Sequence, residues 1–230
     1  MIRTLFLIVL ILFRINSQGQ DEAKNPVNIA LKPQYGFIIP HSSKVEHLTH
    51  TNPYGVEFEY GWLMLKEKNW RQCNCYSKTG ISLLYINFGN PEIVGNSYNI
   101  IGFAEPYFIQ KRGFMFSARM GAGVSFLDKV YNEQTNPTNT FFSTTLSYIV
   151  HIDLNASLQL SKQISILAYA KYNHISNGGV KQPNYGMNFP NFGVGLGYYP
   201  SGNISFSERL KQTYSPEYFY KLNTFGKIKK

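Results

Sequence analysis

Two residues near the end of a predicted strand, His174 and Ser176, have the chemistry of an activated nucleophile. The segment Gln163–Ser176 alternates in polarity with a period of two, which predicts a β-strand, and residues i and i+2 of a strand project from the same face. A histidine beside a serine hydroxyl is the minimal arrangement that activates serine. The triplet alone is a weak signal, because a serine two residues after a histidine occurs by chance in many sequences. The residues that share its face make it more informative.

The strand face that carries His174 and Ser176 is otherwise apolar. Its other members are Ile164, Ile166, Ala168, Ala170 and Tyr172. The opposite face includes Gln163, Lys171 and Asn173. A soluble enzyme would hold a reactive pair in a cleft, whereas this pattern places the pair at the rim of an apolar surface.

The N-terminal segment predicts export. Arg3 precedes the apolar run Leu5–Phe13, and polar residues ending in the small Ser17 follow. The run is too short to cross a bilayer as a helix, so we interpret residues 1–17 as a signal peptide. The formal net charge of +9 indicates affinity for anions, and for an exported protein phosphorylated lipid head groups fit better than nucleic acid.

The composition suits a membrane-embedded sheet. The chain has 230 residues, with 17 Tyr, 17 Phe and 19 Gly but only 15% charged residues, whereas soluble domains have about 25%. Aromatic residues form girdles at the interfaces of outer-membrane barrels. A soluble secreted β-sandwich is the alternative, because it also contains aromatic residues and glycines.

Alternation with a period of two recurs along the chain and predicts eight strands. They are Asn28–Ile39, Gly55–Leu65, Thr79–Gly89, Tyr98–Gln110, Gly113–Leu127, Thr144–Leu160, Gln163–Ser176 and Asn191–Tyr199. Most reach the roughly 9–11 residues that a tilted strand needs to cross a bilayer. The predicted fold is therefore all-β: an eight-stranded antiparallel transmembrane β-barrel over residues 18–200, followed by a basic, aromatic, non-barrel tail at 201–230.

The lengths of the connections favour a barrel over a sandwich. Residues 40–54, 90–97, 128–142 and 177–190 form long connections, whereas 110–113 and 161–163 are short. With the N-terminus in the periplasm, every long connection in this set is extracellular, as in known barrels. An eight-stranded barrel leaves room for side chains but not for a channel, so the inward charged groups are expected to pair. These groups are Glu57, Glu59, Arg119, His151, Asp153 and Lys171.

Cys73 and Cys75 lie in the one long periplasmic connection, residues 66–78. A disulfide between residues i and i+2 would be strained, and no second Cys/His cluster completes a zinc site. We expect a loop feature without chemistry, with pairing between molecules as the alternative. No metal or other cofactor is predicted.

The segment that begins at His174 resembles a family signature. It reads His174-Ile-Ser176-Asn177-Gly178-Gly179-Val-Lys181-Gln182-Pro183-Asn184-Tyr-Gly186. This is similar to the His-x-Ser-Asn-Ala-Gly-x-Lys-Gln-Pro-Asn-x-Gly run of the outer-membrane lipid A 3-O-deacylases. The resemblance implies an outer-membrane carboxylic ester hydrolase that releases a 3-hydroxyacyl chain, with lipid A or lipopolysaccharide as its partner.

The resemblance also implies roles for individual residues. Ser176 would be the nucleophile and His174 the base that takes its proton. Asn177, Gly179 and Asn184 match positions that shape the loop and the oxyanion pocket. A glycine- and asparagine-rich turn is the alternative interpretation of these three residues.

Two further positions concern the substrate and the third catalytic group. Lys181 would meet a lipid A phosphate, or else be an ordinary solvated lysine. Twelve residues after the serine, where the family has a glutamate that orients the histidine, this chain has Asn188. An asparagine accepts an imidazole N–H but cannot offset imidazolium charge. Three interpretations follow: Asn188 is the third member, another acid substitutes, or the enzyme is slow or inactive. The intact remainder of the signature favours the first.

Two non-enzymatic hypotheses stand beside the esterase. Asn188 motivates a non-catalytic small barrel of the adhesin or structural type, and the composition leaves a soluble lectin-like sandwich as a third option. The sequence leaves open the acyl position, the chain length and whether the barrel forms a homodimer.

Overall fold

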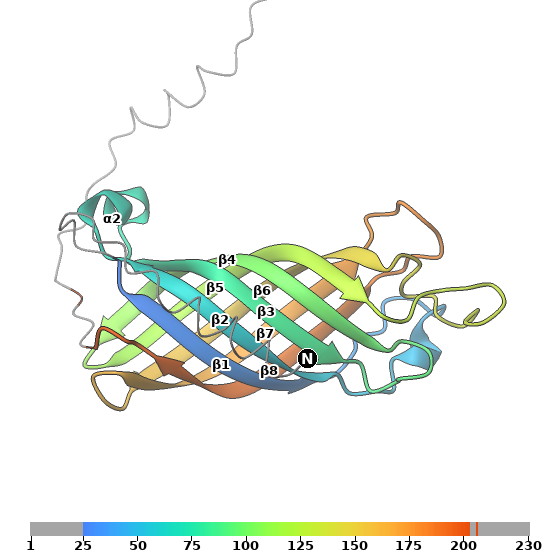
Figure 1. Cartoon of the computed structure of the whole chain (residues 1–230), viewed down its shortest axis with the longest axis horizontal. Coiled ribbons are helices and arrows are strands. Elements are labelled where there is room, and N and C mark those ends of the chain that lie inside the picture. The colour runs from blue at the N-terminus through green and yellow to red at the C-terminus, as the bar shows by residue number, and fades with distance from the viewer. Residues whose placement is uncertain (1–24, 203–205, 207–230) are drawn as a thin grey trace, which may run out of the picture.

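Eight antiparallel strands form a closed barrel (Figure 1). The computed structural model describes residues 25–202 and 206. The strands are β1 (Val27–Gly36), β2 (Tyr54–Met64), β3 (Ser77–Asn87), β4 (Asn96–Lys111), β5 (Phe114–Leu127), β6 (Leu146–Gln159), β7 (Ile164–Ser176) and β8 (Met187–Tyr198). The predicted fold class is therefore confirmed. The predicted signal peptide at 1–17, and nearly all of the predicted tail at 201–230, lie outside the described residues.

The alternation along each strand separates an apolar exterior from a polar lumen. In β6, Leu146, Tyr148 and Val150 are exposed, whereas Ser147 and His151 are buried. Because successive strand side chains point to opposite faces, these three apolar side chains lie on the outside, and Ile149, between Tyr148 and Val150, is buried on the inside. This is the arrangement of a barrel whose exterior contacts lipid.

Buried ion pairs fill the lumen. The described chain buries four basic and four carboxylate side chains there: Lys32, Lys78, Arg119, Lys171, Glu57, Glu59, Glu105 and Asp153. The shortest contacts between these groups join Lys171 to Glu57, Arg119 to Glu59 and Lys78 to Glu59, each at 2.5 Å. Equal numbers of opposite charges in mutual contact satisfy the requirement that buried charges be paired. The predicted pairing of inward charges is confirmed, and Lys32, Lys78 and Glu105 are further members outside the predicted set.

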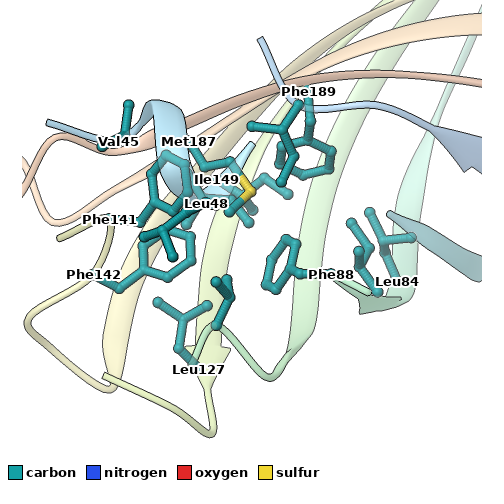
Figure 2. Packing of buried hydrophobic residues seen from close by; sticks show 14 of the residues in the cluster. Val45, Leu48, Leu84, Phe88, Leu127, Phe141, Phe142, Ile149, Met187 and Phe189 are labelled. Carbon is teal, nitrogen blue, oxygen red and sulfur yellow. The ribbon is translucent and has the colours of Figure 1, made fainter. Parts of the chain in front are cut away.

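A cluster of buried apolar side chains, the extracellular plug, closes the end of the lumen that carries the long connections (Figure 2). It consists of Ile38, Val45, Leu48, Leu84, Ile86, Phe88, Val94, Ile101, Leu127, Phe141, Phe142, Ile149, Ile175, Met187 and Phe189. Leu48 comes from the short 3₁₀ helix η1 (Glu46–Leu48). Ile175 and Met187 pair across β7 and β8, so the plug anchors the two strand ends that carry the candidate catalytic residues.

The opposite end carries the helix α2 (Glu67–Cys73), in the connection that the sequence predicted to be a turn. Trp70 of this helix packs in an apolar cluster with Tyr76, Tyr107 and Tyr199. No helix within the described ranges is both long and apolar enough to span a membrane.

Cys73 and Cys75 form a disulfide, so the expectation of a loop feature without chemistry was wrong. Asn74 adopts a left-handed backbone conformation, with φ of 52°. This brings the two Cα atoms to 5.1 Å, a separation that a disulfide spans. The crosslink lies within the chain rather than between molecules.

The eighth strand begins earlier than predicted. The alternation predicts a start at Asn191, but β8 begins at Met187 and includes Pro190. The Pro190 carbonyl accepts a hydrogen bond from the Phe37 N–H at 3.2 Å. The earlier start places Asn188 directly opposite His174.

Candidate active site on the outer face of the barrel

The pairing of β7 with its two neighbours positions His174 and Ser176. His174 lies opposite Val150 of β6 and Asn188 of β8, and Ser176 lies opposite Tyr148. Val150 and Tyr148 are 48% and 63% exposed, whereas Ile175, between the two candidate residues, is buried in the extracellular plug. The imidazole and the hydroxyl therefore share the outer face of the barrel, at its extracellular end.

A chain of hydrogen bonds connects the three candidate catalytic side chains. His174 Nδ1 lies 2.7 Å from Asn188 Oδ1, and His174 Nε2 lies 3.1 Å from Ser176 Oγ. An amide oxygen only accepts hydrogen bonds, so Nδ1 carries the proton of the neutral ring and Nε2 accepts from the serine hydroxyl. This is the tautomer that a general base requires.

The loop after Ser176 is organised by Asn177 and Asn184. The Asn177 N–H donates to Asn184 Oδ1 at 3.2 Å, and the Gly179 N–H donates to Asn177 Oδ1 at 2.9 Å. The buried Asn177 amide also donates to Ser143 Oγ at 3.0 Å and to the Lys181 carbonyl at 2.9 Å. These backbone N–H groups are therefore engaged within the loop, and Asn177 connects it to the connection between β5 and β6.

Lys181 has a fixed backbone and an exposed side chain. Its carbonyl accepts from Ser143 Oγ at 2.7 Å and from the Asn177 amide. The residue is exposed, in the loop between β7 and β8. The neighbouring Gln182–Pro183 peptide bond is cis.

Gly186 lets the end of the same loop pass directly beside the imidazole. Its φ is +65°, and a Cβ atom there would lie 3.1 Å from His174 Cε1 and from Ser176 Cβ. Only glycine combines this backbone conformation with so close an approach. The loop backbone that this glycine brings close therefore limits the space in which the His174 ring can rotate.

An apolar groove of about 700 Å³ begins at His174 and crosses the outer face of four strands. Its outward residues are Gly102, Ala104, Met120, Ala122, Val150, Ile152, Tyr172 and His174. Gly102, Ala122, Val150 and His174 form one cross-strand row. Neighbouring strands lie about 4.8 Å apart, so the row extends roughly 14 Å.

Small side chains on β4 and β5 form the hollow of this groove. A Cβ atom at Gly102 would meet only the Ala122 carbonyl, at 4.0 Å. The sequence reasoning did not identify the groove, although the outward placement of Ala122 was visible in the alternation of the fifth predicted strand. Within residues 25–202 and 206, no three His, Cys, Asp or Glu side chains are grouped so as to hold a metal ion.

The fold and the site together define a class. A closed barrel with an apolar exterior is an outer-membrane β-barrel protein, and the Ser–His–Asn chain on its exterior has the order of contacts found in acyl-transfer hydrolases. Residues 53–197 match a family model described as lipid A 3-O-deacylase (PagL). This match covers more than half of the chain, and the chain belongs to that family. The barrel fold and the family indicate the outer membrane as its location.

Several solved structures resemble the barrel at low sequence identity. The outer membrane enzyme PagL is 14% identical, with a TM-score of 0.46, over 74% of this chain and 97% of that chain. Neisserial surface protein A is 9% identical, with a TM-score of 0.48, over 77% and 99%. Ail, the attachment invasion locus protein of Yersinia pestis, is 11% identical, with a TM-score of 0.44, over 76% and 99%. No curated protein matches the chain.

Proposed function

We propose that this protein is a serine esterase of the outer membrane that hydrolyses an ester-linked 3-hydroxyacyl chain of lipid A. The observation that carries the proposal is the hydrogen-bonded chain Ser176–His174–Asn188 at the mouth of an apolar groove on the outer barrel face. An ester embedded in the outer leaflet reaches such a site from the membrane. Polar groups at a lipid-facing surface are costly, which favours a functional reason for their presence.

The proposed reaction proceeds in two acyl-transfer steps. Ser176 Oγ attacks the ester carbonyl while His174 Nε2 accepts the hydroxyl proton. The tetrahedral intermediate collapses, the sugar oxygen leaves with the proton from His174, and the acyl chain stays on Ser176 as an ester. Water, deprotonated by His174, then attacks this ester, which releases the 3-hydroxy fatty acid and restores the serine hydroxyl.

Asn188 orients the imidazole in this scheme but leaves its positive charge unbalanced. Its carbonyl oxygen holds the Nδ1 proton at 2.7 Å. A neutral amide offsets imidazolium charge less than a carboxylate does, so the positive charge that develops on His174 during the reaction is less stabilised. We therefore propose a working but slow enzyme.

The loop at 177–184 supplies candidates for stabilising the oxyanion. The Asn177 and Gly179 N–H groups are already engaged with Asn184 and Asn177. The Gly178 N–H donates to no group within the part of the chain that the structure describes. We assign Asn177 and Gly179 to shaping this loop, and the Gly178 N–H, together with the Asn184 amide, to the oxyanion.

The groove and Lys181 account for substrate binding in the proposal. The groove is apolar, lies within the lipid-facing exterior and ends at the proposed base, so it suits the acyl chain that is to be released. Lys181 extends into the extracellular space, on the side of the site where a saccharolipid head group would lie, and its ammonium suits a phosphate.

Deacylation of lipid A by the purified, folded barrel tests the proposal. Ser176→Ala and His174→Asn should abolish the release of 3-hydroxy fatty acid, while heat-modifiable migration in detergent shows that both variants still fold. Intact lipid A after prolonged incubation with folded wild-type protein would count decisively against it. The second candidate is a non-catalytic barrel, favoured by Asn188 in place of an acid, and it predicts that neither substitution affects function.

A further inference from the structure

We infer that His41 is a positioning residue for the active site, because it holds the Asn188 amide in the orientation that makes His174 a general base. This inference rests on the proposed esterase function. It concerns a residue of the connection between β1 and β2, far from the signature segment in sequence.

Backbone pairing beyond the end of β1 brings His41 to the site. Ile39 forms an isolated bridge with Asn188, and its N–H donates to the Asn188 carbonyl at 2.9 Å. Val45 and Leu48, further along the same connection, are buried in the extracellular plug. The segment around His41 is therefore anchored on both sides, and the position of its imidazole follows from the fold.

The contacts of His41 define which of its nitrogens carries the proton. Nε2 lies 2.8 Å from the Tyr185 carbonyl, which can only accept, so Nε2 is the protonated nitrogen of the neutral ring. Nδ1 then has a free lone pair, and it lies 3.4 Å from Asn188 Nδ2. The Ile39 carbonyl lies 3.5 Å from the same Nδ1, and two acceptors form no hydrogen bond. The donor for Nδ1 is therefore the Asn188 amide.

This contact distinguishes the two ends of the amide. In the observed orientation, Nδ2 donates to His41 and Oδ1 faces His174 Nδ1 at 2.7 Å. If the amide rotated by half a turn, its NH₂ group would face His174 Nδ1 and its oxygen would face the lone pair of His41. His174 would then have to accept at Nδ1 and carry its proton at Nε2, which could no longer take a proton from Ser176.

A carboxylate at this position would need no such partner, because its two oxygens are equivalent acceptors. An asparagine has one correct and one incorrect orientation, and in a serine protease the incorrect tautomer accounts for most of a loss of about 10⁴-fold. His41 thus compensates for one consequence of having an amide at position 188, the ambiguity of orientation, but not for the missing negative charge.

A double-mutant cycle separates orientation from a general structural role. His41→Ala should lower kcat for lipid A deacylation by about tenfold or more, with little change in KM, because it removes a hydrogen bond that selects the active tautomer. In an Asn188→Asp background the same substitution should change kcat less than about twofold.

His41→Gln, which can still offer an acceptor, should recover part of the activity. His50→Ala, at another exposed position of the same connection, is the matched control and should leave kcat unchanged. Equal losses in both backgrounds would overturn the inference.

A spectroscopic measurement gives an outcome that does not depend on turnover. In ¹⁵N-histidine-labelled protein in detergent, the His174 signals should report the Nδ1–H tautomer in the wild type and a shift towards Nε2–H in His41→Ala. If the wild type does not deacylate lipid A but the tautomer shifts, the proposed function fails and the positioning role stands. An unchanged tautomer in His41→Ala would overturn the positioning role whether or not the enzyme is active.

Discussion

His174 and Asn188 face each other across the pairing of β7 with β8, with His174 Nδ1 2.7 Å from Asn188 Oδ1. The contact is a direct cross-strand pair, so the backbone register sets the distance between imidazole and amide. Ile175 and Met187, the adjacent pair, are buried in the extracellular plug, which resists slippage of that register. The orientation of the base is therefore a property of the barrel itself.

Restoring a carboxylate at position 188 should accelerate the enzyme. Asn188→Asp keeps the size of the side chain and adds a negative charge beside the imidazolium that forms in the transition state, so we expect kcat to rise by about tenfold or more. Asn188→Leu removes the acceptor and should lower kcat by about 10²-fold or more. Initial rates of fatty acid release measure both. An Asn188→Leu variant as active as the wild type would remove Asn188 from the catalytic group.

Filling the groove should reduce turnover of long acyl chains without unfolding the barrel. The space above Gly102 is open, so Gly102→Leu introduces a side chain into the groove that we assign to the acyl chain. We expect kcat/KM for a long-chain substrate to fall by about tenfold, and for a short-chain ester to change little. Ala156→Leu, on the outer face of β6 outside the groove, is the matched control. Equal effects of the two substitutions would contradict the assignment.

Gly186→Ala should impair catalysis more than Gly113→Ala, in the turn between β4 and β5. Both glycines have positive φ, 65° and 80°, so both substitutions carry a backbone cost of about 1 kcal/mol or more. A Cβ at position 186 would lie 3.1 Å from His174 and from Ser176, whereas a Cβ at position 113 would come no closer than 3.5 Å to Gln159. We expect a loss of kcat of about tenfold or more for Gly186→Ala alone. Thermal unfolding of both variants, followed by heat-modifiable migration, controls for stability.

Breaking a buried ion pair in the lumen should destabilise the barrel without altering the site. Lys171→Met leaves Glu57, 2.5 Å from the lysine Nζ, short of a partner, and we expect a loss of about 3–5 kcal/mol in the free energy of unfolding. The double variant Lys171→Met/Glu57→Gln should be more stable than the single one, because no uncompensated carboxylate remains. Urea unfolding in lipid vesicles measures this. If the double variant lost as much unfolding free energy as Lys171→Met and Glu57→Gln lose together, the two residues would not be coupled.

The sequence predicted the barrel because period-two alternation and the sorting of connection lengths are local signals. The outward placement of His174 follows from that alternation alone. The contact between His174 and Asn188 across two strands did not follow, since the predicted eighth strand began only at Asn191 and register is a long-range property. His41 and Asn188 are far apart in sequence, and so are the residues of the row from Gly102 to His174. Only the closed sheet brings each of these sets together. The Cys73–Cys75 disulfide was missed because it depends on the left-handed conformation of Asn74.

The most direct test of the account is mass spectrometry of lipid A after incubation with the purified wild-type barrel, with Ser176→Ala as the matched inactive variant. The account predicts that the wild type removes one 3-hydroxyacyl chain from lipid A and that Ser176→Ala, equally folded, removes none. Lipid A left intact by the folded wild type, or deacylated equally by both proteins, would contradict it.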